Sequence, residues 1–194
     1  MSFIPKNYAS AAAGGNDKPY FAPNKVEAGG QVKFALLDDQ PLCYWELWAT
    51  DGERNKPFRF EDEPNPSAIE AELGPNFTRR RDGKNPEQFE PVKFYMSVPI
   101  YNYVKERVET FSFYQKTVMA EFDQISQLEE YKDLKAIDFV LTRAKEDSPS
   151  MYGLRPIPRM AGNSEKVDAA WTSALENGYD ISRMLTGGQP HVKA

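Results

Sequence analysis

The clearest alternation of apolar and polar positions in the chain covers residues 92–103 and predicts a long strand. Apolar side chains occupy every second position from the start of this segment: Val92, Phe94, Met96, Val98 and Ile100. Because successive side chains of a strand point to opposite faces, the other face would carry Lys93, Tyr95, Ser97, Tyr101 and Tyr103. An aliphatic face builds a core, whereas rings and a cation suit stacking on bases and contact with phosphates. The pattern therefore favours single-stranded nucleic acid as a ligand over enzyme chemistry.

Three shorter segments before this strand predict a β-meander. Apolar residues alternate from Gln31 to Leu36, aromatic residues are dense over 42–49 (LCYWELWA), and 56–60 reads KPFRF. Turn residues separate them at 38–41 and at 50–52. A short helix then begins near Ser67 and ends at Gly74.

The second half of the chain predicts further strands around one helix. The long strand pairs with 105–114 in a hairpin, and a helix with apolar side chains at helical spacing follows over 115–131. Strands are predicted over 135–145 and 151–159, and the prolines in the latter indicate a sheet edge. The predicted helices after them cover 164–177 and 181–185.

These elements predict a mainly β chain with helices. Many short strands with one helix among them are typical of a small Greek-key β-barrel, and the OB-fold has this pattern together with an oligonucleotide-binding face. We expect three parts: a flexible N-terminal arm over residues 1–30, the OB-fold-like barrel over 31–160, and a C-terminal helical extension with a loose tail over 161–194.

Composition limits the chemistry that the chain can perform. Its net charge is −5, so any contact with phosphates depends on local basic patches. One cysteine, Cys43, and one histidine, His191, argue against a disulfide, a zinc cluster or a conventional Ser-His or Cys-His triad. Cys43 is expected to be a small buried side chain. No segment has the length of an apolar membrane span, and no secretory signal precedes the fold, so a cytoplasmic protein without a cofactor is expected.

Rings and cations mark the candidate binding residues in the first half of the chain. In KPFRF a ring can stack on a base while a cation holds the backbone, although an ordinary edge strand has the same pattern. Tyr44, Trp45 and Trp48 lie in one strand, with Trp45 favoured for the core. A basic loop could contact phosphates or simply be solvated. The candidates are Trp48, Lys56, Phe58, Arg59, Arg79, Arg80, Arg81 and Lys84.

The second half adds candidates on the long strand, on its hairpin partner and at the ends of the last two strands. Tyr114 joins the tyrosines of the hairpin as a ring able to stack on a base. For each of these residues, partial burial or ordinary surface solubility remains the alternative. The candidates are Lys93, Tyr95, Tyr101, Tyr103, Arg143 and Arg155. The acidic segment 61–63 could hold Mg²⁺, but an acidic loop explains it as well.

Three stretches of the chain resemble the OB-fold single-stranded DNA-binding proteins of tailed bacteriophages. They are the Trp-containing strand, Asp-Gly turn and KPxRF strand at 44–60, the hairpin running into Gln115-Lys116-Thr117, and the strands of 135–158 with Thr142-Arg143 and Pro-x-Pro. The C-terminal ISRMLTGGQP is also similar. Together they cover roughly residues 32–159.

The resemblance implies a non-enzymatic protein that coats single-stranded DNA in replication, recombination or repair, in the cytoplasm of a bacterial host cell. It implies replication or recombination proteins as partners. The loose composition of the arms separately suggests that they mediate contact between neighbouring copies on DNA. The chain departs from the pattern at its end, GGQPHVKA, where no acidic residue follows Asp180, so recruitment through an acidic tail is not implied. Two alternatives stay open: a β-barrel virion or scaffold component that uses the same rings as a protein interface, and a metal-dependent nuclease.

Overall fold

The computed structural model describes residues 18–145, 148 and 150–191 and shows a mainly β chain. Strand content is 34% against 26% helix, which confirms the fold class at that level. The strands are β1 (Tyr20–Phe21), β2 (Gln31–Leu36), β3 (Leu42–Thr50), β4 (Asn55–Phe60), β5 (Thr78–Arg79), β6 (Lys93–Asn102), β7 (Arg107–Phe113), β8 (Ile137–Arg143) and β9 (Tyr152–Pro158). The helices are α2 (Pro66–Leu73), α3 (Lys116–Ser126) and α4 (Ala161–Glu176), with 3-10 turns η1 (Pro23–Lys25), η2 (Glu129–Tyr131) and η3 (Ile181–Met184). None of these helices has the length and apolar character needed to cross a membrane.

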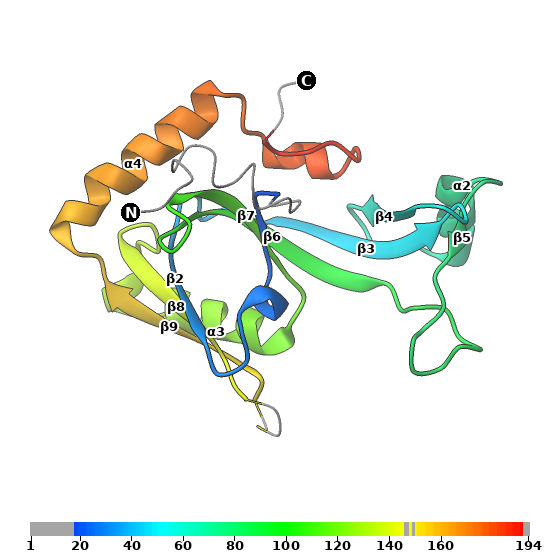
Figure 1. The fold of residues 1–194 in the computed structure, drawn as a ribbon, viewed down its shortest axis with the longest axis horizontal. Helices are drawn as coiled ribbons and strands as arrows, with labels where there is room; N and C mark the ends of the chain where they lie inside the picture. The colour runs from blue at the N-terminus through cyan, green and yellow to red at the C-terminus, as the bar shows by residue number, and fades with distance from the viewer. Residues whose placement is uncertain (1–17, 146–147, 149, 192–194) are drawn as a thin grey trace, which may run out of the picture.

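The strands form one mixed sheet whose main path runs β1-β7-β6-β2-β8-β9. All pairs are antiparallel except β1 with β7. Strand β3 leaves this path: it pairs with β6 at one end and with β4 and β5 at the other. In Figure 1 the main path curves around a ring, and β3, β4, β5 and α2 extend away from it as a wing.

The sheet is open rather than closed into the expected barrel. Among the described residues β9 pairs only with β8, and β1 occupies the edge of β7 that a closing strand would need. Pro156 and Pro158 in β9 lack a backbone N–H, which suits an edge strand and matches the position expected from the sequence.

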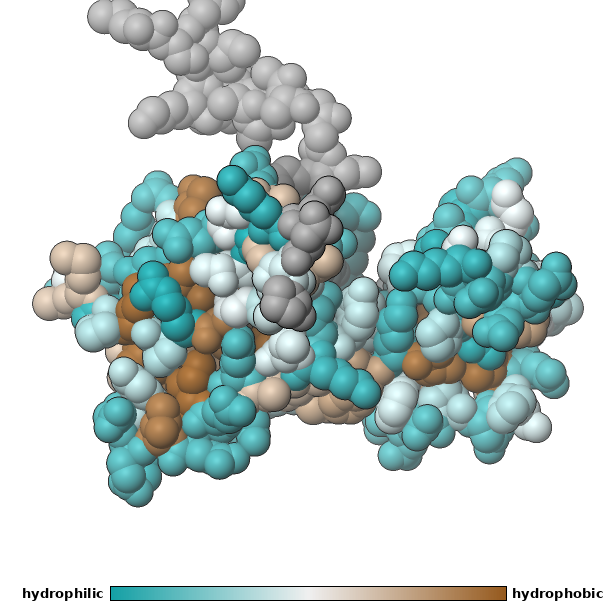
Figure 2. Space-filling view, turned by 90° about the horizontal axis from the view of Figure 1, so that it is seen from below, coloured by the Kyte–Doolittle hydropathy of each residue, from teal (hydrophilic) through white to brown (hydrophobic). Residues whose placement is uncertain are grey.

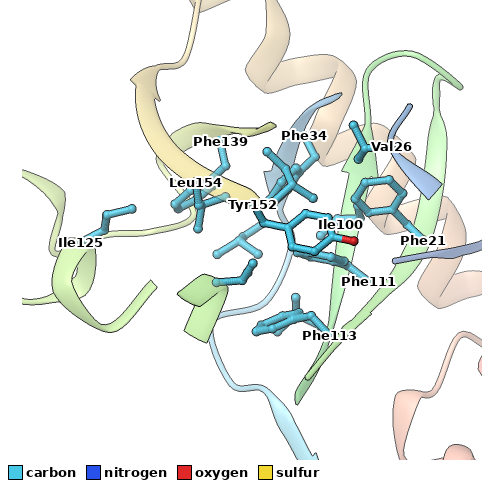
Figure 3. Close-up of a cluster of buried hydrophobic side chains, with 14 of the residues drawn as sticks. Phe21, Val26, Phe34, Ile100, Phe111, Phe113, Ile125, Phe139, Tyr152 and Leu154 are labelled. Carbon is cyan, nitrogen blue, oxygen red and sulfur yellow. The ribbon is translucent and has the colours of Figure 1, made fainter. Parts of the chain in front are cut away.

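An aromatic core fills the space between the curved strands and α3. Phe34 of β2 stacks on Phe139 of β8 with ring centres 5.6 Å apart, and Phe111 of β7 lies 5.3 Å from Phe34. Figure 3 shows these side chains pointing toward one another from β2, β7 and β8. On the long strand β6 the core face carries Met96, Val98 and Ile100, as the alternation predicts.

A second, smaller core holds the wing together. Leu47 and Ala49 of β3 and Phe58 of β4 pack against Ile69 and Leu73 of α2. Asn65 caps this helix by accepting a hydrogen bond from the backbone N–H of Ala68. In Figure 2 the main body and the wing form two lobes, and each brings some hydrophobic residues to the surface among hydrophilic ones.

The two ends of the chain are more ordered than the sequence suggests. Of the expected arm, residues 1–17 lie outside the described residues, but Phe21 and Val26 are buried in the main core, so the boundary at residue 30 is too late. The tail expected to be loose is packed up to His191, whose ring nitrogen Nε2 lies 3.0 Å from the Thr110 hydroxyl. Helix α4 covers the outer face of β6 and β7, with Val167 packed beside Tyr101.

Candidate nucleic-acid interface

A groove of about 580 Å³ lies on the outer face of β3, β4, β6 and β7. Its strand residues are Tyr44, Glu46 and Trp48 of β3, Asn55, Pro57 and Arg59 of β4, Tyr95 of β6 and Ser112 of β7, followed by Tyr114. Residues 18–25 line one side, and Met184 with 187–189 of the C-terminal segment line another. We call this hollow the tyrosine groove.

A row of three tyrosines crosses the tyrosine groove. Tyr44 and Tyr95 face each other across the β3–β6 pair, so their rings stack nearly parallel with centres 5.7 Å apart. Tyr114 continues the row, 5.1 Å from the Tyr95 ring. Tyr44 is buried and its hydroxyl shares a hydrogen bond of 3.0 Å with Ser97, whereas Tyr114 is 42% exposed. Burial raises the pKa of both Tyr44 and Tyr95, so these two side chains are neutral phenols at physiological pH.

Glu46 organises the end of the groove beside the wing. Arg59 lies opposite it in the β3–β4 pair and donates from Nε to its carboxylate at 2.8 Å, and Trp48 donates from Nε1 at 3.0 Å. The guanidinium carbon of Arg59 lies 5.4 Å from the centre of the Tyr44 ring. Burial raises the pKa of the Glu46 carboxyl, and the charge of Arg59 opposes that rise. Glu46 therefore fixes the orientation of both the guanidinium and the indole.

Two more cations lie on the groove side of the sheet. Lys93 donates to the Glu90 carboxylate at 2.8 Å, and its ammonium lies 5.0 Å from the centre of the Tyr114 ring. Arg80 continues β5 on the same face as Trp48, because its backbone N–H donates to the Trp48 carbonyl in the next position of the ladder. The Arg80 side chain is 46% exposed and lies 3.7 Å from Glu90.

The basic loop is therefore divided between two faces. Arg79 and Arg81 point away from Arg80 and both lie over the Phe89 ring, at 5.2 and 4.2 Å. Arg79 also donates to the Glu90 carbonyl, and Arg81 to the Glu87 carbonyl. Lys84 is exposed in the turn between Arg81 and Glu87. The concentrated patch expected from the sequence is thus mainly a support for the loop, with Arg80 directed toward the groove side.

Lys56 and Phe58 point away from the groove. The β4 register puts Arg59 on the groove face, so Phe58, its neighbour, lies on the opposite face. Lys56, two residues before Phe58, shares that opposite face. Phe58 is 5% exposed in the wing core, and the Lys56 ammonium lies 4.7 Å from the centre of its ring. The expectation that Phe58 stacks on a base is therefore wrong, because its face of the strand is the one that α2 covers.

Four other candidates lie outside the groove. Tyr101 is 1% exposed beneath α4, and Tyr103 donates from its hydroxyl to Asp138 at 2.9 Å. Arg143 donates to the carbonyls of Asn24 and Val26 and so ties η1 to β8. Arg155 is exposed on β9, away from the groove lining. Helix α4 covers Tyr101 and the turn η1 takes the hydrogen bonds of Arg143, and strand alternation alone does not reveal either contact.

Other expectations about single residues also differ from the structure. Cys43 is exposed rather than buried, and Trp45 is half-buried against Phe94, with ring centres 5.5 Å apart. Glu46 was not singled out, although a lone acid within an aromatic strand is a signal that could have found it. No comparable signal in the sequence indicates that Met184 and residues 187–189 line the groove. Within the described residues no group of three or more His, Cys, Asp or Glu side chains could hold a metal ion, and 61–63 is an exposed acidic turn.

Comparisons of the chain with protein-family models, with curated proteins and with solved structures gave no match. The residues of the groove and the strand arrangement that brings them together are therefore the features that point to a function.

Proposed function

We propose that this protein binds single-stranded DNA in the tyrosine groove, largely independently of sequence. The observation that carries the proposal is the row of Tyr44, Tyr95 and Tyr114 with the Arg59 guanidinium at one end and the Lys93 ammonium at the other. Every base has an aromatic face, so a row of rings accepts any sequence, while cations along its edge attract the phosphates. A duplex hides these base faces, so the groove suits an unpaired strand.

The order of the strands supports an OB-fold as the framework. If β2 is the first barrel strand, then β6, β7, β8 and β9 are the second to the fifth, and the sheet order β7-β6-β2-β8-β9 is that of an OB-fold. Helix α3 then falls between the third and fourth strands, as the resemblance implies. OB-folds are partly open barrels that bind oligonucleotides on the face of their second and third strands. In this assignment that face belongs to β6 and β7, where Tyr95 and Tyr114 lie.

Each part of the groove has a distinct role in the proposed complex. The exposed Tyr114 ring, with Tyr95 behind it, stacks on one or more bases, and Trp48 stacks on another nearer the wing. Arg80 and Lys93 exchange their surface ion pairs with Glu90 for DNA phosphates, a small cost because such pairs contribute at most about 1 kcal/mol. Arg59 stays paired with Glu46 and offers its flat face rather than a free charge. The chain thereby protects single strands during replication, recombination or repair.

The test is binding of the purified protein to fluorescent oligo-dT and to a matched duplex across a salt series. We expect preferential binding of the single strand, weakened by salt, with quenching of tryptophan fluorescence. Tyr114→Ala should weaken binding roughly 5- to 150-fold, the value of one stacked base. Phe94→Ala is the matched control, because Phe94 is also an exposed ring but lies on the other face of β6 from Tyr95, outside the groove lining. Absence of binding at low salt would refute the proposal and favour a protein-interaction role.

A further inference from the structure

A second hollow lies between α3 and the core side of β6 and β7. Its volume is about 390 Å³, and its apolar lining includes Leu36, Met96, Val98, Phe113, Met119 and Phe122. Its polar lining residues are three aspartates, Asp38, Asp39 and Asp123, together with Ser126, and among the described lining residues there is no lysine or arginine. We call this hollow the acid-rimmed cleft.

The acid-rimmed cleft lies on the opposite side of the sheet from the tyrosine groove. Met96 follows Tyr95 in β6, and Phe113 precedes Tyr114 at the end of β7, so each neighbour points to the other face. The two hollows share no lining residue. An occupant of the cleft therefore leaves the groove open to its own ligand.

The charge at the rim specifies the chemistry of the occupant. Asp38 and Asp39 lie in the turn after β2, and Asp123 lies across the cleft on α3. Within the described part of the chain, the cation that pairs with them is Lys135, 3.9 Å from Asp39, and both of these side chains are about half exposed. An apolar floor beneath a negative rim complements a large apolar side chain flanked by lysine or arginine.

Two methionines make the floor adaptable. Met96 comes from β6 and Met119 from α3, so they line the cleft from two different elements, and both are partly buried against the main core. Methionine is unbranched and polarizable, and it is common on surfaces that accept varied apolar partners. This floor suits the side chains of a protein segment better than a rigid small molecule with fixed polar groups.

We infer that the acid-rimmed cleft binds a basic, apolar-anchored segment of a partner protein while the tyrosine groove is free to hold nucleic acid. This inference does not rest on the proposed function, since it depends on a separate surface.

The methionines also provide the test. Six methionines are present in the chain, and labelling their methyl groups with ¹³C gives separate NMR signals for the cleft (Met96, Met119), the groove (Met184) and the exposed surface (Met160). The full chain is titrated with a synthetic amphipathic peptide of Leu, Phe, Lys and Arg. The control peptide has glutamate in place of each Lys and Arg.

Saturable shifts of Met96 and Met119 with the basic peptide alone, with Met160 unchanged, support the inference. No shift of these two signals, or equal shifts with the acidic peptide, overturns it. If the Met96 and Met119 signals change with protein concentration, the occupant is a second copy of the chain and the inference is overturned. If they change on Phe3→Ser/Ile4→Ser substitution in the absence of peptide, the occupant is the chain's own N-terminal segment, which also overturns it. Oligo-dT should shift Met184 and not Met96 or Met119, so failure of the proposed function is detected separately.

A variant of the rim completes the test. Asp123→Lys should weaken binding of the basic peptide about three- to fivefold, since exposed charges act weakly and are screened by salt. Glu72→Lys changes the net charge equally but lies on α2 in the wing, so it should leave the peptide affinity unchanged. Equal effects of the two variants would indicate attraction by net charge only and would overturn the site.

Discussion

The two faces of β6 and β7 differ in what their side chains contribute. On the inner face Met96, Val98, Phe111 and Phe113 pack into the main core. On the outer face Tyr95, Ser97, Ser112 and Tyr114 form hydrogen bonds, ring contacts and the wall of the tyrosine groove. One pair of strands thus carries both the stability of the fold and the proposed binding surface.

The comparison teaches that ring content alone does not identify a binding face. Phenylalanine dominates the inner face and tyrosine the outer face, because a tyrosine hydroxyl needs a polar partner or water. The outer face is itself divided, since α4 covers Tyr101 at one end while Tyr114 at the other end is exposed. Substitutions on the two faces should therefore separate stability from binding.

Phe111→Ala should give the largest effect and act on stability alone. Phe111 is fully buried, with Phe113, Phe21 and Phe34 rings 4.7 to 5.3 Å away. Its removal leaves a cavity and should lower the free energy of unfolding by about 3–5 kcal/mol, measured by urea denaturation. Tyr114→Ala, at an exposed position just after the end of β7, should change that free energy by less than about 1 kcal/mol. Similar losses in both variants would contradict the division between the faces.

Arg59→Met should give the next largest effect, and one that depends on pH. It leaves the buried Glu46 carboxylate without its cation and should cost about 2–3 kcal/mol at pH 8. Loss of the opposing Arg59 charge raises the pKa of Glu46 further in the variant. Between the unfolded-state and folded-state pKa values, the Glu46 carboxyl therefore binds more protons in the folded state than in the unfolded state. The loss of stability should therefore shrink as the pH falls toward 5.

Two variants test that explanation by the same denaturation measurement. Adding Glu46→Gln to Arg59→Met removes the buried charge and should recover most of the stability at pH 8. Arg54→Met is the matched control on the same hairpin, because Arg54 is 83% exposed and should contribute within about 0.5 kcal/mol. A pH-independent loss in Arg59→Met would show that packing, rather than the unpaired carboxylate, is responsible.

Strand alternation predicted the longer strands and the core face of the long strand from Met96 to Ile100, but not the short strands β1 and β5. The structure has β6, β7, β8 and β9 within a few residues of the expected bounds. Helix α3 ends at Ser126, earlier than the expected 131, and η2 takes up the remainder. Met96, Val98 and Ile100 face the main core as predicted, because burial of one face is a local property of the strand. Phe94, predicted for the same face, is instead 36% exposed beside Trp45, where β6 leaves the main core.

What the sequence could not give is which polar face remains uncovered. Tyr95 and Tyr101 have the same position in the alternation, but α4, some 60 residues later in the chain, packs on Tyr101 only. Arg143 looks like a free surface cation until η1 is seen to accept its hydrogen bonds. In KPFRF the register with β3 decides that Arg59 rather than Phe58 reaches the groove. Each of these outcomes depends on contacts between distant segments.

The smallest expected effect concerns His191, which fastens the C-terminal segment to the outer face of β7. Its ring lies 4.9 Å from the Tyr179 ring and 6.0 Å from that of Tyr20, and its Nε2 is within hydrogen-bond distance of Thr110. Burial lowers the pKa of this imidazole from its ordinary value of 6.5. The folded state therefore binds fewer protons than the unfolded state, so this contribution to stability is present above about pH 6.5 and is lost as the pH falls below it.

His191 is the one histidine in the chain, so substitution isolates its titration. The difference in free energy of unfolding between the wild-type protein and His191→Gln should be largest at pH 7.5 and should narrow by pH 5.5. The main-core variant Phe111→Ala should show the same loss at both pH values, because no titrating group is removed with it. If the gap between the wild-type protein and His191→Gln is constant with pH, the segment is held by its other contacts, such as the bond from Arg59 to the Met184 carbonyl. The outer face would then be as insensitive to pH as the inner one.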